Sequence, residues 1–167
     1  LAWIASGHFW LSETPDIPGT TYPGAATTRM VSWVRLREQD TGDVMLVLNT
    51  HWDHVSQSAR LSSSALIQER AQSLGEGDAL LLLGDLNDGE ESESVTDLRI
   101  GLSLTDAYRS VQPAPDGEEG TYHGFTGSTA GAPIDFVLCA APLMPLDAAI
   151  VRWSVEDSYP SDHYPVQ

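Results

Sequence analysis

Near the middle of this 167-residue chain the sequence reads Ala79-Leu80-Leu81-Leu82-Leu83-Gly84-Asp85-Leu86-Asn87. The apolar run is too short for a buried helix and ends at a glycine, so it predicts a buried strand over 79–83 that leads to an opening. In an extended chain, side chains two positions apart share a face. We therefore expect Asp85 and Asn87 to direct a carboxylate and an amide to one point, while Leu86 faces the core.

The sequence on either side of this strand predicts a layered sheet protein. Further strands are expected over residues 30–36, 44–48, 134–138 and 148–153. Apolar positions from Ser56 to Leu74 have the spacing of one helical face and predict a long helix. Several strands with few helices are typical of an α/β or α+β fold.

The composition is strongly acidic. There are 24 acidic residues against 8 basic ones, and no Lys, which gives a formal net charge of −16. This charge repels the phosphate backbone of DNA and disfavours binding of nucleic acid through basic side chains. We expect the surplus both to cover a surface suited to high salt and to surround a divalent cation. The single cysteine, Cys139, excludes an internal disulfide.

The length fits one domain, residues 1–167. The chain begins without methionine and ends at Val166-Gln167, where another strand is starting. We therefore expect a domain truncated at its N-terminus and in its last strand. No apolar run approaches the roughly 18 residues that cross a bilayer.

Polar residues gather where the expected strands end. They are the stretch from His51 to His54, Asp85 with Asn87, Asp135, and the pair Asp162-His163. Asp135 lies in an apolar run, and burying a carboxylate costs several kcal/mol unless it is paired. An imidazole held by such a carboxylate gains basicity at its other nitrogen, so His163 is the candidate partner. The alternative is that Asp135 caps a turn through backbone amides.

Seven short segments resemble, in this order, the endonuclease/exonuclease/phosphatase superfamily of deoxyribonuclease-I-like, metal-dependent phosphoesterases. They are Phe9–Pro15, Asn49–His51, Gly84–Asn87, Leu104–Ala107, Thr121–Phe125, Ile134–Phe136 and Ser161–His163. The resemblance runs from near residue 9 to the end and is to the C-terminal portion of the family domain. It implies a four-layer α-β-β-α sandwich of two packed mixed sheets, here lacking the N-terminal strands that carry the family's Asn and principal metal-ligating Glu.

The resemblance also implies roles for individual residues. His163 would be the catalytic histidine, held by Asp135. Asp85 would orient or deprotonate the attacking water, and Asn87 would hold Asp85 and bond a phosphate oxygen.

The family's remaining roles concern the cation and the substrate. Asp162 and Asp85 would bind one Mg²⁺ or Mn²⁺. His51 would contact the phosphate or the leaving group, and Trp52 and His123 would lie near the substrate. The partner would be a phosphoester substrate: a nucleic acid, a lipid head group or a small phosphate ester. The acidity of the chain favours a small phosphate ester.

Two other functions stay open. The stretch His51-Trp52-Asp53-His54 resembles the metal-binding loop of zinc-dependent metallo-β-lactamase-like hydrolases, although Asn49 stands where that loop needs a histidine. The chain could also be a non-catalytic interaction module that retains the fold. Separately, the expected N-terminal truncation would leave apolar strand edges exposed and favour self-association of the fragment.

Overall fold

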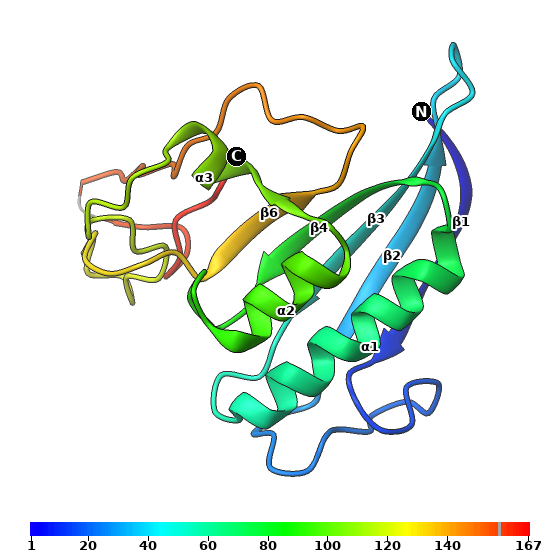
Figure 1. The fold of residues 1–167 in the computed structure, drawn as a ribbon. Coiled ribbons are helices and arrows are strands. Elements are labelled where there is room, and N and C mark those ends of the chain that lie inside the picture. Colours follow the sequence, from blue (N-terminus) through cyan, green and yellow to red (C-terminus); the bar gives the residue numbers. More distant parts are fainter. Residues whose placement is uncertain (157) are drawn as a thin grey trace.

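The computed structural model describes residues 1–156 and 158–167 and contains one mixed sheet (Figure 1). The strand order is β1-β2-β3-β4-β6-β5. The strands are β1 (Ala2–Trp10), β2 (Met30–Arg37), β3 (Val44–His51), β4 (Ala79–Asp85), β5 (Thr105–Asp106) and β6 (Asp135–Cys139). In this sheet β3 and β4 pair in parallel, and the other neighbouring strands are antiparallel.

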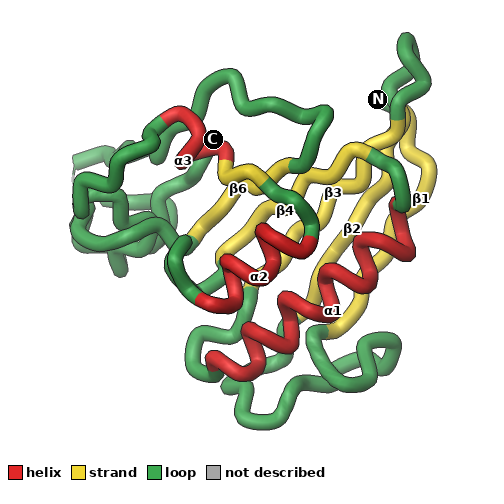
Figure 2. The backbone as a smooth tube through the Cα atoms, viewed as in Figure 1, coloured by secondary structure: helices red, strands yellow, loops and turns green. Residues whose placement is uncertain are grey.

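The parallel pair needs a crossover, and the long helix α1 (Gln57–Gly75) supplies it. Ser56 caps this helix by accepting a hydrogen bond from the Ala59 N–H at 3.2 Å. Helix α2 (Glu93–Gly101) lies beside α1 on the same face of the sheet, and α3 (Ala107–Val111) follows β5 (Figure 2). In the described residues, no helix is both long and apolar enough to cross a membrane.

The main core lies between the two helices and the sheet. Fully buried side chains from both layers meet there, among them Leu48, Ile67, Leu82, Leu98 and Leu138. Alternate residues of the same strands point to the other face of the sheet. There Val47, Leu81, Leu83 and Val137 are only half-buried. The face of the sheet that packs against α1 and α2 is therefore fully covered, and the opposite face is only partly covered.

Most of the predicted elements are confirmed. The strand over 79–83 forms and continues to Asp85, and Leu86 is fully buried after it. The predicted helix and the strands over 30–36, 44–48 and 134–138 form with small shifts of their ends. The strand predicted over 148–153 is wrong, because in the described residues this segment makes only one isolated bridge, from Ile150 to Val166.

The α/β class is confirmed, but the expected four-layer sandwich of two packed sheets is wrong for the described residues. They form one six-stranded sheet. The chain after β6 runs mainly as loops that contain Pro142, Pro145, Pro160 and Pro165. Proline has no N–H for a strand ladder, which explains why this segment makes bridges rather than a second sheet.

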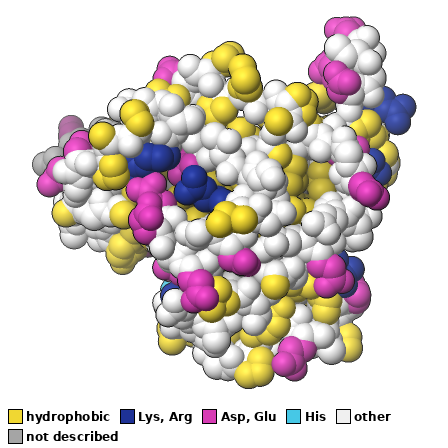
Figure 3. All heavy atoms as spheres, viewed as in Figure 1, with side chains coloured by type: hydrophobic (Ala, Val, Ile, Leu, Met, Phe, Trp, Pro, Cys, Tyr) yellow, Lys and Arg dark blue, Asp and Glu magenta, His cyan; other side chains and the backbone are white. Residues whose placement is uncertain are grey.

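The acidic side chains are spread over the surface. On the face shown in Figure 3, which carries α1 and α2, they do not gather at one place. On this face the negative charge is therefore not concentrated at a single site.

Candidate active site

Three strands bring polar side chains to one edge of the sheet. His51 ends β3 and pairs in register with Asp85, which ends β4. Asp85 in turn pairs with Asp135, the first residue of the antiparallel β6. The sheet register alone therefore aligns an imidazole and two carboxylates in one row.

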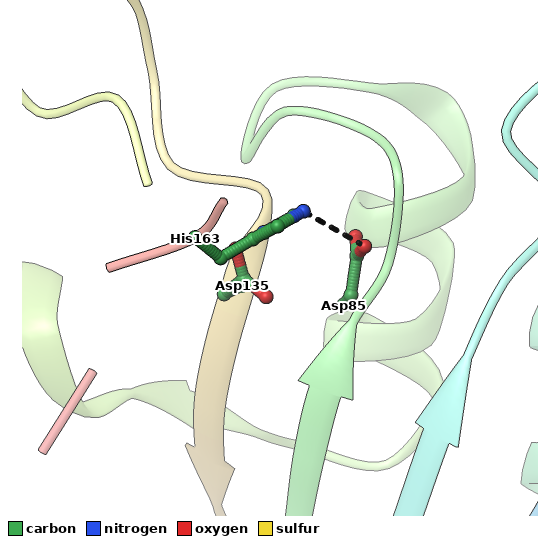
Figure 4. Close-up of side chains that lie close together, drawn as sticks. All are labelled: Asp85, Asp135 and His163. Atoms are coloured by element: carbon green, nitrogen blue, oxygen red, sulfur yellow. Dashed lines mark hydrogen bonds and ion pairs between the residues drawn. The ribbon is translucent and has the colours of Figure 1, made fainter. Parts of the chain in front are cut away.

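His163 comes to this row from the C-terminal segment, where it forms an isolated antiparallel bridge with Tyr122. Its Nδ1 lies 2.7 Å from Asp135 Oδ2, which is a short hydrogen bond. Its Nε2 points toward Asp85 and lies 3.9 Å from Oδ2 of that residue (Figure 4). The predicted pairing of Asp135 with His163 is thus present.

Asp85 is the centre of the cluster. Its Oδ1 accepts a hydrogen bond from the backbone N–H of Asn87 at 2.8 Å, and its Oδ2 lies 3.1 Å from His51 Nε2. One ligand atom each from Asp85, Asp135 and His163 lies within 4.8 Å of the others. These half-buried groups are consistent with a site for a divalent metal ion.

The surroundings shift the pKa values of His163 and His51 in opposite directions. Burial lowers the pKa of His163, but the hydrogen bond to Asp135 and the charges of Asp135, Asp85 and Asp162 outweigh it, so the pKa is raised. Burial also lowers the pKa of His51, and the charges of Arg29 and His163 add to that effect, so its pKa stays below the usual value. His163 is therefore the more readily protonated of the two.

The pKa of Asp85 is raised. Burial is the largest cause, and the charge of Asp135 adds to it, while the backbone hydrogen bond from Asn87 acts in the opposite direction. A carboxylate in this environment accepts a proton more readily than an exposed one does.

A family model described as the endonuclease/exonuclease/phosphatase family matches residues 3–163. The chain belongs to this family. The expected membership is confirmed, although the match lends no support to restricting the resemblance to a C-terminal portion of the family.

Several solved structures have the same fold. A mannosyl-6-phosphatase from Bacteroides thetaiotaomicron is 30% identical with a TM-score of 0.86, and the match covers 98% of this chain and 64% of that one. A family protein from Bacteroides vulgatus is 25% identical, with a TM-score of 0.82 and coverages of 98% and 63%. A conserved protein of unknown function from Enterococcus faecalis is 28% identical, with a TM-score of 0.84 and coverages of 98% and 64%.

The chain thus spans slightly less than two thirds of these relatives' length. No curated protein matches it. Nothing in the comparisons supports the expected self-association.

Asn87 contacts Asp85 in a different way from the one expected. Strand β4 ends at Asp85, and Asn87 has a φ of 49°, so it is not two positions along an extended strand. Its side-chain amide donates to the carbonyl oxygen of Trp52 at 2.9 Å. Asn87 therefore holds Asp85 through its backbone N–H, and the expectation of a shared strand face is wrong.

Trp52 and His123, expected near the substrate, both have buried side chains. Trp52 is 0% exposed and belongs to the core, and His123 is 4% exposed. The His123 ring packs between Tyr159 and Tyr164, with centroid distances of 4.7 and 4.1 Å. Trp52 does not reach the surface of the site, whereas His123 lines one cavity together with His163. Tyr122 is an exposed aromatic residue in contact with His163.

The residues of the predicted zinc loop do not converge in the structure. The Asp53 carboxylate accepts four backbone N–H hydrogen bonds, from Ala26, Thr27, Val55 and Ser56. His54 Nδ1 lies 3.5 Å from an Arg29 nitrogen, and His51 contacts Asp85 instead. Asp53 is thus a structural acceptor that fixes the loop before α1.

Asp162 lies close to the cluster but is not one of the three residues that form it. Its backbone carbonyl accepts hydrogen bonds from the N–H groups of His123 and Gly124 at 2.9 and 3.1 Å, and its charge helps to raise the pKa of His163. Its role as a metal ligand stays a prediction.

Proposed function

We propose that this protein is a Mg²⁺-dependent phosphoesterase that hydrolyses a P–O bond by attack of an activated water. The observation that carries the proposal is the His163–Asp135 pair, whose free imidazole nitrogen faces Asp85 at 3.9 Å. Family membership and the 30% identity to a mannosyl-6-phosphatase support it.

The donor set fits a divalent cation. Among the described residues, the ion-pair partners of Asp85 and Asp135 are histidines, and neither pairs with an arginine. Two half-buried carboxylates at one point repel each other, and a cation beside them relieves that repulsion. Oxygen ligands suit Mg²⁺ or Mn²⁺, so we assign the ion to Asp85, with Asp162 as the further predicted ligand. When bound, such an ion polarises the phosphoryl group and lowers the pKa of water.

His163 is the group placed to act on the substrate. Asp135 accepts the Nδ1–H hydrogen bond, which fixes the ring and leaves Nε2 directed to the reacting oxygen. The raised pKa favours the protonated ring, which donates a hydrogen bond to a phosphoryl oxygen as negative charge develops there.

Asp85 is the group placed to orient the attacking water and accept its proton. The Asn87 backbone N–H holds one carboxylate oxygen, and His51 holds the other. His51 is also about half-exposed, so it can contact the phosphate or the leaving group. Asp85 and His163 thus supply a proton acceptor and a hydrogen-bond donor next to each other at one phosphoryl group.

We infer that the substrate is a small phosphate ester. The net charge of −16 disfavours duplex DNA, whose binding normally depends on basic side chains. The mannosyl-6-phosphatase among the solved relatives points in the same direction.

The test is phosphate release from mannose 6-phosphate, with bis-p-nitrophenyl phosphate and plasmid DNA as competing substrate classes. Each reaction is run with Mg²⁺, Mn²⁺, Zn²⁺ or EDTA. We expect the monoester to react with Mg²⁺ or Mn²⁺ and EDTA to abolish the reaction. Preference for Zn²⁺ would favour the zinc-hydrolase alternative, and no turnover of any substrate with any metal would favour the non-catalytic module.

A further inference from the structure

The segment Thr121-Tyr122-His123 exposes one aromatic ring between two buried side chains. Thr121 is 0% exposed, Tyr122 is 55% exposed and His123 is 4% exposed. Large aromatic side chains stabilise a protein or a complex most when they are removed from water. An aromatic side chain that is exposed to solvent beside a reactive group is therefore a candidate contact for a ligand.

The backbone on both sides of Tyr122 is fixed to the active site. The Thr121 hydroxyl oxygen accepts hydrogen bonds from the backbone N–H groups of Ile134 and Asp135, at 3.0 and 3.2 Å. The Thr121 carbonyl accepts the N–H of Tyr164 at 2.7 Å, and the His123 N–H donates to the Asp162 carbonyl at 2.9 Å. Tyr122 is therefore tied to the two segments that carry Asp135 and His163.

The ring of Tyr122 lies against His163. The two ring centroids are 5.1 Å apart with an interplanar angle of 61°, which is an edge-on arrangement. Tyr122 is nevertheless 55% exposed. The phenol and most of the ring thus remain available to a molecule bound at His163.

Gly124 keeps the space beside this ring open. It adopts a φ of +54°, and a Cβ atom there would lie 3.2 Å from the Tyr122 hydroxyl oxygen. A side chain at this position would crowd the phenol and strain the backbone. The residue that follows, Phe125, is also exposed and has a φ of 62°.

We propose that Tyr122 is a specificity-determining residue that packs against the leaving group of the substrate, and that this leaving group contains a ring, such as a sugar. The inference rests on the proposed function, because that function places the phosphoryl group against His163 and Asp85. The leaving group then extends along the side of His163 where Tyr122 lies. A ring offers the flat contact that an aromatic side chain needs, and an open-chain alcohol does not.

The experiment compares mannose 6-phosphate with glycerol 1-phosphate in the wild-type protein and in Tyr122→Ala, Tyr122→Leu and Tyr122→Phe. For mannose 6-phosphate we expect KM to rise about 3- to 10-fold in Tyr122→Ala and Tyr122→Leu, the range that one aromatic contact supplies. Tyr122→Phe keeps the aromatic ring, so its KM for mannose 6-phosphate should stay close to that of the wild-type protein. For glycerol 1-phosphate, KM should change less than about 2-fold.

Trp3→Ala is the matched control, because Trp3 is an exposed aromatic residue in β1 (69% exposed) away from the site. Trp3→Ala should leave KM unchanged for both substrates. Circular dichroism of each variant checks the fold, and Tyr122→Leu keeps the test valid if Tyr122→Ala does not fold.

Equal losses of kcat for both substrates would overturn the proposal, since Tyr122 would then act only by positioning the His163 ring. Titration calorimetry separates this result from failure of the proposed function. If the wild-type protein hydrolyses no phosphoester but Tyr122→Ala weakens binding of mannose 6-phosphate and not of orthophosphate, the catalytic function is refuted and the contact is retained. If neither binding nor turnover depends on Tyr122, the contact is refuted.

Discussion

Two clusters of charged side chains, one largely buried and one about half-buried, are built in opposite ways. In one, Arg109 of α3 forms paired hydrogen bonds with Glu90 at 2.8 and 2.8 Å and with Glu119 at 3.1 and 2.7 Å. In the other, the active-site row, Asp85 and Asp135 lie close together with imidazoles as their ion-pair partners. The first cluster pairs its charges, and the second leaves two like charges side by side.

The difference distinguishes a structural cluster from the proposed active site. The Arg109 guanidinium uses its donors on two carboxylates, so it ties α3 to two loops and has little capacity left for a ligand. Repulsion between two carboxylates costs stability unless a cation or a substrate proton enters, so a cluster of that kind is retained for binding or chemistry.

The largest expected effect is on catalysis. Asp85→Asn and His163→Ala should each lower kcat by about 10²–10⁴-fold, because each removes a group that transfers or donates a proton in the transition state. Steady-state kinetics of phosphate release measures this. For Asp85→Asn the free energy of unfolding should change by less than about 1 kcal/mol, since Asn relieves the repulsion from Asp135. Near-normal turnover in either variant would mean that the roles are misassigned.

Substitutions in the Arg109 cluster should lower the stability of the protein. Arg109→Met leaves Glu90 and Glu119 buried without a partner and should lower the free energy of unfolding by about 3–5 kcal/mol. Urea denaturation followed by circular dichroism is the measurement. Arg109→Lys keeps the charge but not the paired hydrogen bonds. Its free energy of unfolding should lie between those of the wild-type protein and Arg109→Met. If Arg109→Met were as stable as wild type yet inactive, the distinction between the two clusters would fail.

A smaller effect is expected at His51. His51→Gln removes the contact to the Asp85 carboxylate and should lower kcat about 10-fold, the amount that one hydrogen bond to a charged group supplies. The kinetic assay used for Asp85 measures it. His54→Gln is the control, because His54 contacts Arg29 and not the cluster, and it should change kcat less than about 2-fold.

The smallest effect concerns acid stability and lies outside both clusters. Burial raises the pKa of Asp53, but four backbone hydrogen bonds outweigh it and leave the pKa below the usual value. A carboxyl with a lowered folded-state pKa stabilises the protein above its unfolded pKa of about 3.9, and the contribution is lost as the pH falls through the folded-state value. Asp53→Asn should therefore cost about 1–2 kcal/mol at pH 6 and progressively less below about pH 4. A pH-independent difference in urea titrations would contradict this.

The sequence predicts the strand ends well, because apolar runs specify buried strands and polar residues directly after them must lie at the sheet edge. The convergence of His51 and Asp85 follows from that rule, and the antiparallel register places Asp135, the first residue of β6, beside Asp85. The pairing of Asp135 with His163 was predictable because a carboxylate in an apolar run requires a partner.

The orientation of single side chains in loops was not predictable in the same way. Asn87 follows the strand in a left-handed conformation, and Trp52 turns into the core just after β3 ends. Neither conformation has a periodic signal in the sequence. In Thr121-Tyr122-His123, alternation would have identified Tyr122 as the exposed residue if the segment had been recognised as extended.

A double-mutant cycle on Asp85 and His163 tests most directly whether the strand ends form one catalytic site. We predict that the variant carrying both Asp85→Asn and His163→Ala releases phosphate no more than a few-fold more slowly than the slower single variant, because residues that act as a unit are strongly non-additive. A loss equal to the product of the two single losses would show that the residues act independently, which would contradict a shared site.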